Sequence, residues 1–121
     1  MRILIVDDDD IARLIIGQNI KLTQELKATV LEAENGEVGI EKIADEKPDA
    51  IFLDLNMPVM NGFEVLEILN SKANTIPVYV VTSSNLEDDQ EKCNQYKFIK
   101  GYFQKPFTQV HIQQFINSIN L

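Results

Sequence analysis

Residues 50–58 read Ala50-Ile51-Phe52-Leu53-Asp54-Leu55-Asn56-Met57-Pro58. Four apolar residues in a row that end on a carboxylate, with Pro58 soon after, are typical of a short strand buried on both faces of a sheet. Asp54 stands where this strand leaves the sheet, and open α/β sheets bind their ligands at that edge. Taken alone, an Asp here is more often a turn residue than a functional carboxylate. The ends of the other apolar runs decide between these two interpretations.

Other short apolar runs predict further strands, and segments with helical spacing lie between them. We expect strands at 2–6, 28–33, 50–53, 78–81 and 101–103. Helical spacing predicts helices over the segments that hold 11–22, 38–44, 63–69, 86–96 and 110–119, with an Asp as the N-cap of the first. Strands that alternate with helices predict an α/β fold, with a parallel sheet, helices on both faces and right-handed crossovers. The periodicity leaves the strand order open.

Length and composition favour one acidic domain. The chain has 121 residues, is 45% hydrophobic and carries a net charge of -8, which argues against direct binding of nucleic acid. Cys93 is the one cysteine, so no internal disulfide can form and a zinc cluster is disfavoured. The apolar run at the start is too short for a signal peptide, and no stretch has membrane-spanning length. We therefore expect a cytoplasmic protein without membrane contacts.

Polar side chains follow four of the predicted strands. Asp7 and Asp8 follow the first strand, Asp54 the third, Thr82 the fourth and Lys105 the fifth. Each alone could be a helix cap, a turn residue or a surface charge. In a parallel sheet, however, the carboxyl ends of the strands lie at one edge, so we expect these side chains to meet there. Four such coincidences favour a functional site.

The predicted cluster has the composition of a phosphoryl-transfer site. Carboxylates that lie together repel one another unless a cation is present, and oxygen ligands suit Mg²⁺. His111, the one histidine, falls in the last helix, which argues against zinc or copper. A nearby cation would keep Asp54 ionised, as a nucleophile must be. Thr82 and Lys105 could then hold the oxygens of a transferred phosphoryl group.

Five separated motifs carry a resemblance to a known family. They are Val6-Asp7-Asp8, the stretch from Leu53 to Pro58 with Gly62, Val81-Thr82-Ser83, Gly101-Tyr102 and Lys105-Pro106-Phe107. In this order they resemble the receiver domain of two-component response regulators, especially the free-standing, chemotaxis-type regulators. The resemblance runs from end to end. It implies a single receiver domain over residues 1–121, no effector domain, and a flavodoxin-like sheet in the order 2-1-3-4-5 with five helices.

The resemblance implies a phosphoacceptor and a metal site. Asp54 resembles the residue that takes a phosphoryl group from a histidine kinase or a phosphotransfer protein. Asp8 resembles the direct Mg²⁺ ligand, and Asp7 the ligand that acts largely through water. Asn56 resembles the residue whose backbone carbonyl completes the metal site, which Asp54 shares.

The resemblance also assigns switch and lifetime residues. Lys105 resembles the cation that pairs with the acceptor and then with the phosphoryl group, and its bond to the following proline is expected to be cis. Thr82 resembles the switch hydroxyl and Tyr102 its aromatic partner. Asn56 and Ser84 stand at the positions that flank the hydrolytic water and tune the lifetime of the acyl phosphate.

The sequence departs from the family pattern at two places. The chain reads Tyr96-Lys97-Phe98-Ile99-Lys100 where the family usually has a Gly-Ala pair. Tyr96, Phe98 and Tyr102 place aromatic side chains near the expected output surface; we expect Phe98 to pack the last helix onto the sheet, and the alternative is that one or two of the three are exposed for a partner protein. Gly39 stands at a helix position where Ala is common, at a cost in helix propensity of about 1 kcal/mol. Gly62 matches the family's loop glycine, where a Cβ would be unwelcome.

These features together predict a Mg²⁺-dependent phosphorylation switch. It would signal to a downstream protein through the surface of its fourth helix, fifth strand and fifth helix. It would be no enzyme beyond catalysing its own phosphotransfer and autodephosphorylation. A haloacid-dehalogenase-like phosphatase is a rival, but such enzymes need an acid where this chain has Asn56. A receiver-like module that binds partners without phosphorylation is the second rival.

Overall fold

A computed structural model of the chain describes residues 1–83 and 85–119. This part of the chain forms one parallel sheet in the order β2-β1-β3-β4-β5, which confirms the flavodoxin-like prediction. The strands are β1 (Arg2–Val6), β2 (Thr29–Ala33), β3 (Ala50–Leu53), β4 (Val78–Thr82) and β5 (Ile99–Gln104). The helices are α1 (Asp10–Leu22), α2 (Gly36–Glu46), α3 (Gly62–Ser71), α4 (Leu86–Cys93) and α5 (Gln109–Ile119), with a short 3₁₀ turn η1 (Gln24–Leu26).

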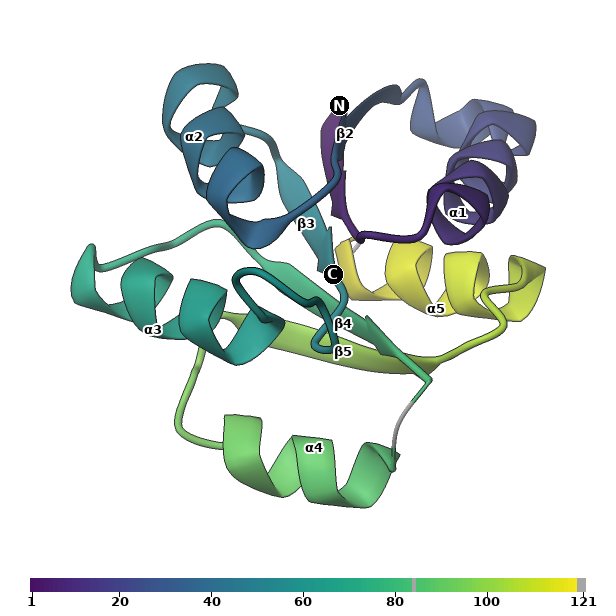
Figure 1. Cartoon of the computed structure of the whole chain (residues 1–121). Coiled ribbons are helices and arrows are strands. Elements are labelled where there is room, and N and C mark those ends of the chain that lie inside the picture. Colours follow the sequence, from purple (N-terminus) through teal and green to yellow (C-terminus); the bar gives the residue numbers. More distant parts are fainter. Residues whose placement is uncertain (84, 120–121) are drawn as a thin grey trace.

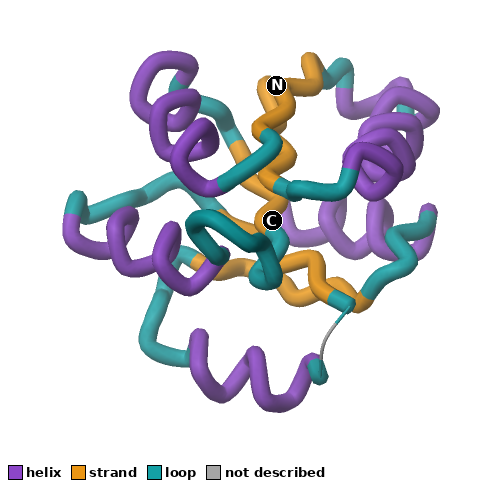
Figure 2. The backbone as a smooth tube through the Cα atoms, in the orientation of Figure 1, coloured by secondary structure: helices purple, strands orange, loops and turns teal. Residues whose placement is uncertain are grey.

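Helices cover both faces of the sheet, and each face has its own core (Figures 1 and 2). Helices α1 and α5 lie over one face, where Phe52, Tyr79 and Phe115 pack edge to face. Helices α2, α3 and α4 lie over the other face, whose core is mostly aliphatic. All four residues of β3 are buried, as a central strand with both faces covered requires.

The strand register brings the first and third strand ends together. Val6 at the end of β1 pairs with Leu53 at the end of β3. The backbone N–H of Asp54 donates to the Val6 carbonyl at 2.9 Å, so the pairing continues past the strand end. Asp7 and Asp54 therefore leave the sheet side by side.

The boundaries of β2, β4, β5 and α4 and one packing expectation differ from the prediction. Strand β5 is longer than the predicted 101–103, and α4 ends at Cys93 rather than at 96. Tyr96 and Phe98, which follow α4, are buried in the core under α3 and α4, so their apolar character reflects a packed loop rather than more helix. The expectation that Phe98 packs the last helix is wrong, because α5 lies on the other face.

Helix α1 exposes most of the apolar residues whose spacing predicted it. Its buried residues are Ile16, Gly17 and Ile20. The exposed ones form what we name the α1 stripe: Ile11 (67% exposed), Leu14 (56%), Ile15 (38%) and Leu22 (75%). The helical periodicity was thus a correct signal of a helix, but it marked a solvent-facing surface rather than the core.

Two glycines allow close contact between helices and strand ends. A Cβ on Gly62, at the start of α3, would lie 2.5 Å from the Asp54 carbonyl oxygen and 2.6 Å from Leu55 Cα. A Cβ on Gly39 in α2 would lie 3.0 Å from a methyl carbon of Val6, which explains a glycine inside that helix. The structure thus bears out the expectation that a Cβ at Gly62 is unwelcome.

We expect Gly62→Ala to lower the free energy of unfolding by about 1–3 kcal/mol, because the clash is with backbone that cannot move aside. Gly17→Ala is the matched control, since a Cβ there meets its nearest neighbour at 3.8 Å. Relief of the glycine's helix penalty should make that variant more stable by up to about 1 kcal/mol. Urea unfolding measures both, and a Gly62→Ala protein as stable as the wild type would contradict the expectation.

Candidate functional site

The four consecutive aspartates after β1 each have a different environment. Asp7 is buried, and its Oδ1 accepts a hydrogen bond from the Asp9 N–H at 2.9 Å. Asp9 is the N-cap of α1 and accepts from the Ile11 N–H at 2.9 Å, as predicted for this helix start. Asp10 forms an ion pair with Arg13 one turn later, whereas Asp8 is exposed to solvent. A run of like charges is thus distributed among separate contacts.

Three carboxylates and a lysine meet at the carboxyl edge of the sheet, and we name them the acidic mouth: Asp7, Asp8, Asp54 and Lys105. Carboxylate oxygens of the three aspartates lie within 4.8 Å of one another. Lys105 Nζ lies 2.8 Å from Asp7 Oδ2 and 3.7 Å from Asp54 Oδ2. The peptide bond between Lys105 and Pro106 is cis, as expected. The predicted convergence of these four residues is present.

Burial and repulsion destabilise the ionised form of Asp54. The side chain is 4% exposed. Burial, followed by the charge of Asp7, raises the pKa of Asp54 to about 6, although Lys105 and the Asn56 N–H (3.3 Å from Oδ1) act in the opposite direction. Burial is the largest single influence on Lys105 and lowers the pKa of its ammonium, but the hydrogen bond to Asp7 and the charges of Asp54, Asp7 and Asp9 together outweigh it, so the pKa is raised.

The acidic mouth fits a hard divalent cation. Its three carboxylates offer oxygen ligands, the kind that Mg²⁺ prefers. Asp7 Oδ2 is buried with no donor aligned for a hydrogen bond among the described residues, although Lys105 pairs with it as an ion. This oxygen of Asp7 therefore has capacity to bind a further positive charge.

Thr82 and Asn56 are joined beside the acidic mouth. Thr82 is fully buried, and its Oγ1 accepts a hydrogen bond from Asn56 Nδ2 at 3.3 Å. The Thr82 carbonyl accepts from the Lys105 N–H at 2.8 Å, so the end of β4 fixes the backbone from which Lys105 extends. Asn56 itself is exposed.

Tyr102, the predicted partner of Thr82, lies away from the acidic mouth. It pairs with Val80 of β4, which stands two residues before Thr82, and packs half-buried against the core under α3 and α4. Tyr102 is therefore on the strand next to that of Thr82, and its role as a switch residue stays a prediction. Ser84, the second predicted lifetime residue, lies outside the described residues.

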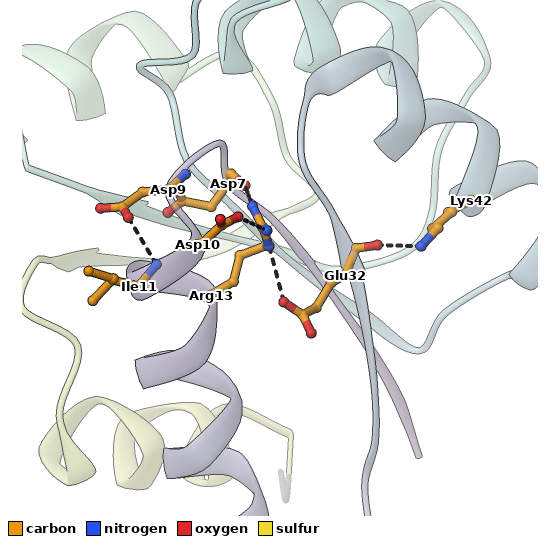
Figure 3. Close-up of polar contacts among 7 residues, drawn as sticks. All are labelled: Asp7, Asp9, Asp10, Ile11, Arg13, Glu32 and Lys42. Carbon is orange, nitrogen blue, oxygen red and sulfur yellow. Dashed lines mark hydrogen bonds and ion pairs between the residues drawn. The ribbon is translucent and has the colours of Figure 1, made fainter.

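Arg13 is a residue of this region that the sequence analysis missed (Figure 3). Its side chain is 11% exposed, and Nη1 donates to the Asp7 carbonyl at 2.6 Å while Nε donates to Glu32 Oε1 at 3.0 Å. Its spacing from Asp10, three residues earlier in a predicted helix, is a signal that could have found it.

An apolar groove adjoins the acidic mouth. It has a volume of about 340 Å³ and is lined mainly by Ile11, Ile15, Pro106 and Phe107, with Lys105 at its polar end. The groove is continuous with the α1 stripe, because Ile11 and Ile15 belong to both. Apolar surface thus lies directly beside the charged residues.

A model of the response regulator receiver domain matches residues 3–117. The chain belongs to this family. Among relatives, this receiver domain is 35% identical to the protein PilH of Pseudomonas aeruginosa, over 98% of this chain and 96% of that protein. It is 42% identical to the nitrate/nitrite response regulator protein NarL of Escherichia coli over 72% of this chain, but spans 40% of NarL's length. Receiver domains are the regulatory parts of response regulators, consistent with phosphorylation-dependent two-component signalling.

Solved structures have the same fold as this receiver domain. The chemotaxis protein CheY4 of Vibrio cholerae superimposes with a TM-score of 0.81 at 23% identity, over 96% of this chain and 95% of that one. A LuxR-family DNA-binding response regulator from Staphylococcus aureus gives a TM-score of 0.85 at 26% identity, over 99% and 98% of the two chains. Within residues 1–83 and 85–119, no helix has the length and apolar character needed to cross a membrane.

We expect the stability of the metal-free protein to depend on pH through Asp54. Its pKa is higher in the folded state, so its protonated form adds stability that is lost as the pH rises through about 6. In EDTA, the free energy of unfolding of the wild type, relative to Asp54→Asn, should fall by about 2 kcal/mol between about pH 4 and about pH 8.

Asp49→Asn, which removes a carboxylate at the opposite edge of the sheet beside the Arg2 N–H, is the control. Urea unfolding at each pH measures all three proteins. A wild-type profile parallel to that of Asp54→Asn would contradict the expected effect of burial and repulsion on Asp54.

Proposed function

We propose that this receiver domain is a phosphorylation switch whose Asp54 accepts a phosphoryl group from a histidine kinase or a phosphotransfer protein. One observation carries the proposal: a buried carboxylate lies among two further carboxylates and a lysine at the carboxyl edge of a parallel sheet. The membership of the chain in the receiver family supports it.

The oxygen ligands of the acidic mouth suggest how the domain holds Mg²⁺. In this proposal Asp8 and Asp54 bind it directly, Asp7 binds it largely through water, and the backbone carbonyl of Asn56 completes the set. A bound magnesium ion supplies positive charge that offsets the repulsion between the carboxylates and an incoming phosphoryl group. The exposure of Asp8 and the burial of Asp7 are consistent with this division.

In the transfer step, a carboxylate oxygen of Asp54 forms a bond to phosphorus as the bond from phosphorus to the donor's histidine nitrogen breaks. The electron pair of that bond stays on the nitrogen. Lys105, whose Nζ lies 3.7 Å from Asp54 Oδ2 in the unphosphorylated protein, then contacts one phosphoryl oxygen. The Thr82 hydroxyl, which accepts a hydrogen bond from Asn56 in the unphosphorylated protein, moves to donate to a second phosphoryl oxygen. In hydrolysis, water attacks phosphorus as the bond from phosphorus to the Asp54 oxygen breaks, which restores the carboxylate and releases inorganic phosphate. We expect Asn56 to flank the path of this water, and Ser84, which lies outside the described residues, stays a predicted lifetime residue.

The output is a change in the surface formed by α4, β5 and α5, read by a downstream protein. Helix α4 is suited to move, because its buried residues are Asp89 and Cys93 and, apart from the half-buried Leu86, the rest of it is polar. Tyr102 lies on the strand between α4 and α5 and couples that surface to Thr82 through the pairing of β4 with β5. The match over 96% of PilH supports a receiver domain that works as a unit of this kind.

The phosphodonor docks on the groove and on the part of the α1 stripe that lines it, Ile11 and Ile15. A donor must cover the acidic mouth to bring its phosphohistidine to Asp54, and the apolar surface beside the mouth is that of Ile11, Ile15 and Pro106. An exposed stripe with helical spacing fits the apolar face of a partner helix.

Acetyl phosphate with Mg²⁺ tests the acceptor. We expect one phosphoryl adduct on Asp54 in intact-protein and peptide mass spectra, absent in EDTA and in Asp54→Asn. Asp49→Asn should be modified like the wild type. An adduct that persists in Asp54→Asn, or none in any protein, would reject the proposal and favour a module that acts without phosphorylation.

The phosphatase alternative has a separate test. Because Asn56 cannot act as a general acid, we expect no turnover of a small phosphomonoester with Mg²⁺. Sustained multiple turnover that is lost in Asp54→Asn would show that the protein is an enzyme rather than a switch.

Docking on α1 predicts different effects of two substitutions in one helix. Ile11→Asn should slow transfer from a cognate phosphodonor protein by about tenfold, because it removes an apolar contact beside the mouth. Leu22→Asn, at the far end of α1 and 75% exposed, should have little effect. Both should react with acetyl phosphate like the wild type, since this small donor needs no docking surface. Equal rates of protein-donor transfer in the two variants would contradict docking at the groove.

A further inference from the structure

We propose that Arg13 is a positioning residue that fixes the peptide between Asp7 and Asp8 and thereby sets how tightly the acidic mouth binds a divalent cation. The inference rests on the proposed function, because it concerns the same cation site. It assigns a role to a residue outside the acidic mouth that contacts none of the carboxylates in it.

Arg13 joins three segments of the chain (Figure 3). Nη1 donates to the Asp7 carbonyl at 2.6 Å, Nε donates to Glu32 Oε1 on β2 at 3.0 Å, and Nη2 pairs with Asp10 in the first turn of α1. The Arg13 side chain is 11% exposed and its contact with the Asp7 carbonyl is partly buried, whereas the side chains of Asp10 and Glu32 are 88% and 54% exposed. A planar guanidinium with donors at fixed angles can hold three acceptors in one arrangement.

The contact with the Asp7 carbonyl matters because of where that carbonyl lies. It belongs to the peptide that links Asp7 to Asp8, so a rotation of this peptide would change the separation of their carboxylates. The N–H of Asp7 donates to the Ala33 carbonyl at 3.1 Å, and Asp7 Oδ1 accepts from the Asp9 N–H. Arg13 holds the remaining backbone polar group of Asp7, its carbonyl oxygen, while Lys105 pairs with Oδ2.

The anchor of Arg13 is itself held in place. Glu32 lies in β2, which pairs with β1 through Ile5, and the Glu32 carbonyl accepts a hydrogen bond from Lys42 of α2. Arg13 therefore ties the segment of Asp7 and Asp8 to β2, and the pairing of β2 with β1 fixes the position of that strand. Such outer contacts commonly change metal affinity by about 10–100-fold when removed.

Charge and positioning predict opposite effects of removing Arg13. A positive charge near a cation site weakens cation binding by Coulomb repulsion, so its removal alone should tighten Mg²⁺ binding. If Arg13 positions the peptide, its removal should weaken Mg²⁺ binding despite the lost repulsion. The sign of the change therefore separates the two roles.

Calorimetric titration with magnesium chloride tests the inference on the unphosphorylated protein. We expect the dissociation constant of Mg²⁺ to rise about tenfold in Arg13→Met. Arg13→Lys keeps the charge but lacks the planar guanidinium, and should also bind Mg²⁺ more weakly. Lys42→Met is the matched control. It removes a positive charge that contacts the Glu32 carbonyl but not the segment of Asp7 and Asp8. Its affinity for Mg²⁺ should be unchanged or higher.

The outcomes distinguish this inference from the proposed function. A wild-type protein that binds no Mg²⁺, or Asp8→Asn that binds it equally well, would overturn the cation site and the inference with it. Normal wild-type binding with Arg13→Met as tight or tighter would overturn the inference alone, as would equal weakening in Lys42→Met. Circular dichroism in EDTA checks folding. If Arg13→Met does not fold, the affinity of Arg13→Lys for Mg²⁺ tests the inference: weaker binding supports it, and binding as tight as in the wild type overturns it.

Discussion

Repulsion among carboxylates is the constraint on which this structure depends. Asp7 and Asp54 are buried, and their carboxylate oxygens lie within 4.8 Å of each other and of Asp8. Water would screen the repulsion between charges this close, whereas a protein interior screens it much less. Lys105 offsets part of the repulsion, while burial first and the charge of Asp7 second raise the pKa of Asp54. One lysine faces three carboxylates, so the cluster keeps a net negative charge when all three are ionised, and this is the charge that the proposed cation would neutralise.

Rigid backbone keeps the carboxylates from moving apart. The Asp54 N–H is hydrogen-bonded to the end of β1, and α3 begins so near the Asp54 carbonyl that a glycine, Gly62, is required there. The end of β4 fixes Lys105 through the Thr82 carbonyl. The strands beneath are buried on both faces, so relaxation of the acidic mouth would disturb two cores at once.

The sequence analysis predicted the cluster but not its support. Parallel strands end at one edge, so the convergence of Asp7, Asp54 and Lys105 followed from topology alone. The strand order needed the family resemblance, because apolar periodicity carries no information on which strands are neighbours. The spacing of Arg13 from Asp10 could have identified a helical ion pair, but its other two partners, the Asp7 carbonyl and Glu32 of β2, are revealed by no local pattern. The exposed α1 stripe shows the limit of periodicity, which identifies a helix face but not what covers it.

The α1 stripe also affects how the protein behaves in concentrated solution. Exposed apolar side chains along one helix would favour self-association, and the net charge of -8 opposes it by long-range repulsion between molecules. That repulsion weakens as salt shortens the screening length, whereas the attraction between apolar surfaces does not. Colloidal stability of this domain is therefore a balance between apolar attraction and charge repulsion, which ionic strength shifts and to which the α1 stripe contributes.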